Sequence, residues 1–133
     1  MVFDYDGVNQ QLVVGRPYDN VVTLFRLTYV PPVADAGPDQ EVKALALVTL
    51  DGRGSSDPDN DLPLTYGWTQ TGGPAVTLSD PSVISLTFTA PGVTTVLTFT
   101  LTVTDSLGLA DPTPDEVVVT VPLYYYYFPM VNR

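Results

Sequence analysis

The stretch Asp51-Gly-Arg-Gly-Ser-Ser-Asp-Pro-Asp-Asn-Asp61 is followed, after Leu-Pro, by Leu64-Thr-Tyr-Gly-Trp-Thr-Gln-Thr-Gly-Gly-Pro74. The first part is built from Asp, Asn, Ser and Gly, whose short side chains favour turns because they hydrogen-bond to their own backbone. The second part carries Trp68, the single tryptophan of the chain, and a tryptophan gains much free energy from burial. The two stretches therefore predict an acidic turn that leads directly into a core strand anchored by Trp68.

The composition of the whole chain agrees with a β-structure. Valine and threonine are abundant, and both are β-branched residues that suit a pleated surface. Glutamate occurs only at positions 41 and 116 and lysine only at position 43, so the residues that usually cover helices are nearly absent. The 13 prolines and 10 glycines interrupt the chain at intervals typical of short strands. The chain is predicted to be all-β.

Several stretches around the acidic turn have the pattern of strands. The clearest is 96–105, where Leu and Phe side chains alternate with threonines, as in a strand with one apolar and one hydroxyl-rich face. About seven short strands separated by turns indicate an antiparallel sandwich of two sheets. Besides the tryptophan strand, the expected strands are Leu45–Leu50, Val76–Leu78, Ile84–Thr89, Val96–Asp105 and Glu116–Val121.

The chain divides into three parts by composition. Residues 1–32 contain a strand-like stretch, Val21–Val30, that is apolar on both faces, followed by the stiff pair Pro31-Pro32. Residues 33–121 form the central sandwich. Residues 122–133 contain an aromatic run with side chains for both faces of an extended strand. We therefore expect a central sandwich with an extra strand segment at each end.

Charge and residue types exclude several functions. The net charge is −10, and the five basic residues are scattered, so a nucleic acid partner is not expected. The chain has no cysteine and no histidine, which removes disulfides, thiol catalysis and histidine-assisted nucleophiles. We predict that the protein is not an enzyme. No stretch is long enough to span a membrane, and no Asn-x-Ser/Thr site for N-glycosylation occurs.

The acidic turn is a candidate cation site. Asp57, Asp59 and Asp61 alternate along the chain, a spacing that can bring carboxylates together around a hard cation such as calcium. An EF-hand is excluded, because Leu62 stands where its glycine belongs and Trp68 where its final glutamate belongs. The alternative is a plain aspartate-rich turn without a metal, in which each carboxylate caps its own backbone.

The central part also resembles a known family. Its motifs include Trp68-x-Gln70-x-x-Gly73-Pro74, and they occur together and in the order of the polycystic kidney disease (PKD) domain. The match is best to the K319-like and receptor-for-egg-jelly-like variant, since the common Trp-x-Phe-Gly-Asp-Gly signature is absent. The motifs are Ala34-x-Ala-Gly-x-Asp39, Leu50–Asp61, Leu64–Pro74, Phe88-Thr-Ala-Pro91 and Leu101-Thr-Val-Thr-Asp105.

The resemblance implies an immunoglobulin-like β-sandwich that is non-catalytic and lies outside the cell or on its surface. Such domains occur in adhesins, surface-layer proteins and polysaccharide-degrading enzymes. Some bind calcium near the acidic turn with help from the entry segment, which here suggests Asp35 or Asp39, together with Asp105. The N-terminus has no basic and apolar export signal, so an exported protein would be a processed form or a fragment.

The two terminal segments lie outside the resemblance and carry the functional hypotheses. They either pair within the molecule or dock on a neighbouring copy by adding a strand to a sheet edge, which can build a filament. We expect the second, a self-assembling structural protein; the alternative is an adhesion or binding module of a larger secreted protein that contacts polysaccharide or surface proteins. The expected interface residues are Phe25, Leu27, Tyr29, Tyr124, Tyr125, Tyr126, Tyr127 and Phe128.

Overall fold

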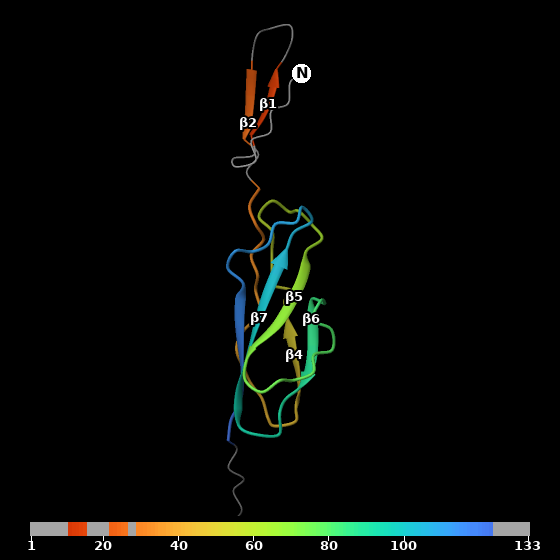
Figure 1. Cartoon of the computed structure of the whole chain (residues 1–133), viewed down its shortest axis with the longest axis vertical. Helices are drawn as coiled ribbons and strands as arrows, with labels where there is room; N and C mark the ends of the chain where they lie inside the picture. The colour runs from red at the N-terminus through yellow and green to blue at the C-terminus, as the bar shows by residue number, and fades with distance from the viewer. Residues whose placement is uncertain (1–10, 16–21, 27–28, 124–133) are drawn as a thin grey trace, which may run out of the picture. The chain divides into compact units, whose positions relative to one another are not determined.

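The computed structural model describes residues 11–15, 22–26 and 29–123 (Figure 1). All regular elements in these ranges are β-strands, and no helix there is long and apolar enough to cross a membrane. The chain divides into two compact units, Met1–Val30 and Pro31–Arg133.

The first unit contains two strands, β1 (Gln11–Gly15) and β2 (Val22–Arg26). They pair antiparallel, from Gln11 opposite Arg26 to Gly15 opposite Val22. The strand expected over 21–30 is therefore shorter than predicted, because Tyr29 and Val30 lie outside any strand. Within the described residues, β2 pairs only with β1. In this two-stranded sheet each strand therefore has one backbone edge without a partner among the described residues.

The second unit is a sandwich of two sheets, as predicted. One sheet has the order β3-β8-β7-β5, and the other pairs β4 with β6. All pairs are antiparallel except β3 with β8, which run parallel. Figure 1 shows β4 and β6 beside each other. The strands are β3 (Gln40–Glu41), β4 (Leu47–Asp51), β5 (Thr65–Gly72), β6 (Ser85–Thr89), β7 (Thr95–Thr104) and β8 (Asp115–Val121).

The core lies between the sheets and follows the alternation in the sequence. From Leu97 to Val103 of β7 every second residue is fully buried, and the threonines between them are half-buried on the outer face. Phe99 packs against Phe88 of β6, with ring centroids 4.9 Å apart. Trp68 is 3% exposed, and its indole Nε1 donates a hydrogen bond to the carbonyl oxygen of Val83. The buried apolar residues of the strands are Val48, Leu50, Trp68, Leu86, Phe88, Leu97, Phe99, Leu101, Val103, Val117, Val119 and Val121.

The strand predicted over Val76–Leu78 is absent, and the Gln70 side chain explains why. Its amide Nε2 donates to the carbonyl oxygens of Gly72 and Pro74 at 3.0 and 2.7 Å, and its Oε1 accepts the Val76 N–H at 3.0 Å. The Gln70 side chain thus bonds to backbone groups that would otherwise pair with a neighbouring strand. The turn that Gln70 holds requires a glycine at position 73. Gly73 has a φ of +83°, and a Cβ atom there would collide with the backbone of Val96.

Aspartate carboxylates hold the segment that enters the sandwich. Asp111 accepts the N–H of Ala34 at 2.6 Å, and Asp115 accepts the N–H of Ala36 at 2.8 Å. Asp39 in turn accepts the N–H of Val118 at 2.8 Å. These side-chain bonds replace a regular ladder between residues 34–39 and the region around β8, so β3 itself needs only two residues.

Candidate metal centre

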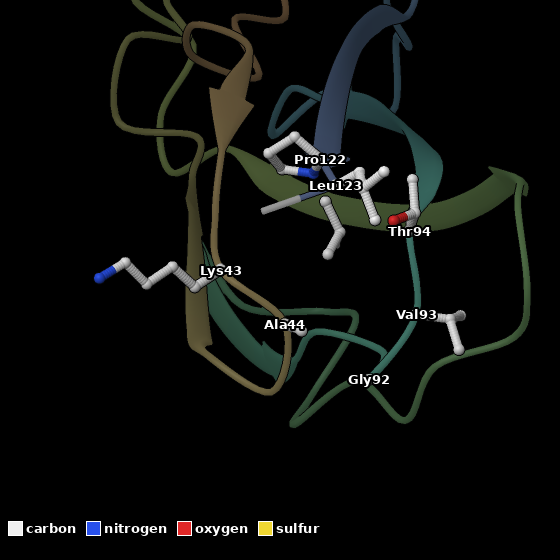
Figure 2. Close-up of a pocket in the computed structure, with 8 residues that line it drawn as sticks. Lys43, Ala44, Gly92, Val93, Thr94, Pro122 and Leu123 are labelled. Atoms are coloured by element: carbon white, nitrogen blue, oxygen red, sulfur yellow. The ribbon is translucent and has the colours of Figure 1, made fainter. Parts of the chain in front are cut away.

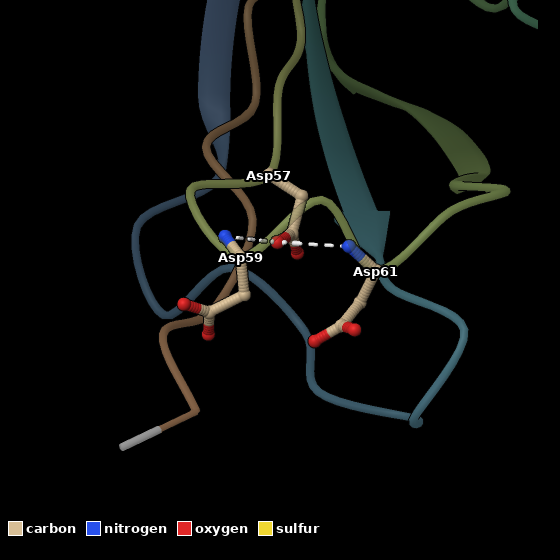
Figure 3. Close-up of side chains that lie close together, drawn as sticks. All are labelled: Asp57, Asp59 and Asp61. Carbon is tan, nitrogen blue, oxygen red and sulfur yellow. Dashed lines mark hydrogen bonds between the residues drawn. The ribbon is translucent and has the colours of Figure 1, made fainter. Parts of the chain in front are cut away.

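The acidic turn is organised by one of its own aspartates. Asp57 Oδ1 accepts the backbone N–H of Asp59 at 2.7 Å and that of Asp61 at 3.3 Å (Figure 3). Asn60 takes a left-handed conformation with a φ of 63°, which asparagine tolerates better than most residues, and donates its N–H to the carbonyl of Asp57. The turn chemistry predicted from the sequence is therefore present.

The three aspartates of this turn bring their carboxylates together. Asp57, Asp59 and Asp61 each offer one oxygen, and these three atoms lie within 4.8 Å of one another. Asp59 is exposed, whereas Asp57 and Asp61 are half-buried. In the described part of the chain, Oδ2 of Asp57 and Oδ2 of Asp61 are buried and have no hydrogen-bond partner. Buried ionised oxygens are unfavourable unless they are paired or bind a metal, so the set fits a cation.

The electrostatics of Asp61 point the same way. Removal of its carboxyl from water raises the pKa of Asp61 above the usual value. The negative charges of Asp57, Asp59 and Asp105 raise this pKa further. The turn therefore concentrates negative charge that a bound cation would relieve.

Asp105 approaches this cluster from a different element. It directly follows β7, is 4% exposed, and uses Oδ1 to accept the N–H groups of Leu107 and Leu109 at 2.8 and 2.9 Å. The next residue, Ser106, donates its N–H to the Asp61 carbonyl at 3.1 Å. The loop after β7 and the acidic turn are thus in direct contact.

The predicted ligand Asp35 lies outside the cluster of Asp57, Asp59 and Asp61. Its Oδ1 accepts the Gly37 N–H at 2.9 Å, and its carboxylate lies so close to Gly54 that a Cβ there would collide with it. Asp39 is also engaged elsewhere, at Val118. Asp35 thus caps its own turn and Asp39 bonds to β8, and neither carboxylate belongs to the cluster of Asp57, Asp59 and Asp61.

The other predicted functional residues fall in different places. Phe25 belongs to β2, and Tyr29 is half-buried outside a strand. The side chain of Phe25, together with Leu27, Tyr124, Tyr125, Tyr126, Tyr127 and Phe128, lies outside what the structure describes.

A pocket that the sequence did not predict lies near the start of β7. It has a volume of about 260 Å³ and is lined by the turn around Lys43, the turn around Val93, and the residues that follow β8 (Figure 2). Two apolar side chains are exposed at this pocket: Leu123, which lines it, is 61% exposed, and Leu45, which lies beside Gly92, is 71% exposed. Leu45 also has a φ of 63°, a conformation that is rare for a bulky residue. No periodic pattern indicates such a pocket, because three separate loops build it.

Comparisons with known proteins agree with this architecture. The family model "K319L-like, PKD domain" matches residues 36–121. The solution structure of the PKD domain from KIAA 1837 protein is 37% identical, with a TM-score of 0.56 over 67% of this chain and 84% of that chain.

A second similar structure is a nucleoside hydrolase-related hypothetical protein from Saccharophagus degradans that is associated with carbohydrate metabolism. It is 26% identical, with a TM-score of 0.52, and the match covers 70% of this chain but only 26% of that one. PKD domains are β-sandwich modules that are generally non-catalytic and typically extracellular. On the family match and the sandwich together, the chain belongs to the K319L-like PKD domain family.

Proposed function

We propose that the protein is a non-catalytic, extracellular structural module whose acidic turn binds calcium. The observation that carries the cation site is the pair of buried, unpartnered oxygens on Asp57 and Asp61 within a cluster of three carboxylates. Calcium takes six to eight oxygen ligands in flexible geometry, so exposed Asp59 and water molecules can complete the shell. Magnesium fits less well, because it requires a near-ideal octahedron.

Calcium is expected to raise the melting temperature of the protein. Extracellular modules bind calcium with Kd values of about 0.1–1 mM, so about 10 mM calcium would stabilise the folded state by about 1–3 kcal/mol. For a domain of this size, each kcal/mol corresponds to a rise of about 4–8 °C. The measurement is thermal unfolding in calcium and in chelator. An Asp61→Asn variant serves as the negative control, and an identical midpoint for the native chain in both buffers would refute the site.

We further propose that copies of the protein associate through their terminal segments, by addition of a strand to a sheet edge, and so form an extended assembly. The aromatic run at 124–128 follows directly on Leu123, where the sandwich exposes apolar side chains beside the pocket. Soluble monomers rarely leave such surfaces uncovered, so a second copy is a fitting partner.

Deletion of residues 124–133 tests this association. The full chain is expected to sediment as oligomers whose size grows with protein concentration, and the shortened chain as a monomer with an unchanged melting temperature. Replacing Tyr124–Tyr127 by serine is the matched control for chain length. A full chain that stays monomeric at every concentration would rule out self-association. Its retention on an insoluble glycan would then favour the alternative, an accessory binding module of a larger secreted protein.

A further inference from the structure

The turn from Lys43 to Ala46 holds a leucine at a position that normally takes a glycine. Ala46 donates its N–H to the Lys43 carbonyl at 3.1 Å, and Leu45, the third residue of this turn, has a φ of 63°. Turns with a positive φ at this position usually carry Gly or Asn there, because a bulky side chain is strained. Leu45 gains little packing within the chain, since its side chain is 71% exposed. The fold of this unit therefore does not explain the leucine.

The Leu45 side chain lies at the rim of the pocket near the start of β7. Its Cδ2 atom would be 3.3 Å from a Cβ atom on Gly92, and Gly92 lines that pocket. Val93 and Leu123 line it as well, and they are 62% and 61% exposed. Three large apolar side chains from three separate segments are thus exposed around one pocket, an arrangement typical of interaction sites.

The pocket fits an uncharged, apolar group. Its volume of about 260 Å³ corresponds to roughly eight water molecules, which is enough for one aromatic side chain. Among the described residues that line it, none is acidic and Lys43 is the single basic one. Figure 2 shows the Lys43 side chain extended away from the other labelled residues. Two copies with a net charge of −10 each repel one another, and this repulsion is weaker at a pocket without carboxylates.

The segment that follows Leu123 supplies groups of this kind. Residues 124–128 are four tyrosines and a phenylalanine, and they begin directly after the lining of the pocket. To reach the pocket of its own copy, this run would have to reverse its direction, and it contains no Gly, Asn, Asp, Ser or Pro to form a turn. The pocket of a second copy can be reached without a turn.

We propose that this pocket is the acceptor site for the aromatic run of a second copy. One aromatic side chain from residues 124–128 fills the pocket, and Leu45 packs against it. The proposal rests on the association through terminal segments proposed above, and it names the surface on which the run docks. It also gives the strained leucine a role, because the exposed side chain serves the contact between copies.

The Leu45→Gly variant separates the contact from the turn. Glycine adopts a positive φ without strain, so the melting temperature is expected to stay the same or to rise. Association of the full chain, measured by sedimentation over a range of protein concentrations, is expected to weaken by about tenfold or more, because the contact loses a leucine side chain. A leucine that served the turn alone would leave association unchanged.

Two further variants define the result. Ala44 is exposed and lines the pocket, so a tryptophan in Ala44→Trp fills the space without entering the core and is expected to abolish association. Leu107 is 53% exposed in the loop after β7, whereas the pocket lies near the start of that strand, so Leu107→Gly is expected to associate like the native chain.

The outcomes distinguish the acceptor site from the association itself. If deletion of residues 124–133 abolishes association while Leu45→Gly and Ala44→Trp associate like the native chain, the run docks elsewhere and the assignment of the pocket is wrong. A native chain that stays monomeric would instead refute the proposed association as a whole.

The methyl groups of Leu45 and Val93 report on the pocket without any substitution. In NMR spectra of the native chain, their signals are expected to shift as the protein concentration rises, while those of Leu107 stay in place. A difference between the native and the shortened chain that is the same at every concentration would mean that the run occupies the pocket of its own copy. That result would overturn the assignment to a second copy.

Discussion

Replacement of Phe99 by alanine is expected to lower the free energy of unfolding by about 3–5 kcal/mol, the usual loss for a buried phenylalanine. Phe99 is fully buried at the middle of β7 and packs against the Phe88 ring of the opposite sheet. The truncation removes this contact and leaves a cavity that two hydrogen-bonded sheets cannot close. Urea unfolding measured by tryptophan fluorescence gives the value, because Trp68 is the single reporter.

The neighbouring Thr100 provides the control. Its side chain is half-buried on the outer face of the same strand, so Thr100→Ala is expected to change the free energy of unfolding by less than about 1 kcal/mol. Similar losses for Phe99→Ala and Thr100→Ala would contradict the packing of the two sheets described above.

Replacement of Asp111 by alanine is expected to lower the free energy of unfolding by at least about 3 kcal/mol, because a hydrogen bond to a charged group contributes about 1.5–3 kcal/mol. The carboxylate is 6% exposed and accepts three hydrogen bonds, one from Ala34 and two from Thr113. The N–H of Ala34 would lose its acceptor. Asp80→Ala, at an exposed turn, is the matched control and is expected to lose less than about 1 kcal/mol.

The pH dependence of the difference in unfolding free energy between the native chain and Asp111→Ala tests whether the Asp111 carboxylate causes it. Burial raises the pKa of Asp111, but the hydrogen bonds from Ala34 and Thr113 outweigh burial and bring the pKa below the usual 3.8. The folded state therefore holds its proton less tightly than the unfolded state. The stabilisation is fully present above pH 3.8 and is lost as the pH falls through the lowered pKa. The unfolding free energies of the native chain and of Asp111→Ala should converge in strong acid. A difference that stays constant with pH would mean that Asp111 acts through packing.

The parts of the fold that local patterns specify were predictable. The alternation over 96–105 gave β7 with its buried face, and the turn residues before Trp68 gave the start of β5. The strand expected over Val76–Leu78 was wrong, because the Gln70 side chain satisfies that backbone. A run of β-branched residues cannot reveal that a glutamine several positions earlier replaces the ladder.

The candidate site was predictable to the same extent. The spacing of Asp57, Asp59 and Asp61 is local, and the structure brings their oxygens together. Asp105 was suggested by the family resemblance alone, because its place beside the turn depends on the path of the chain after β7, which spacing along the sequence does not contain. Asp111 was missed for the same reason, since its partner Ala34 lies 77 residues earlier.

The parallel pairing of β3 with β8 determines how the sandwich responds to mechanical force. The chain enters beside the start of β8, where Asp111 and Asp115 hold it, and leaves after the end of β8. A pull on these two points slides parallel segments past each other, so the bonds between residues 34–42 and the β8 region are loaded in shear and together. An antiparallel pair in this position would open one bond at a time. A domain linked to other domains at both of these points would thus resist extension through the bonds of β3, its shortest strand.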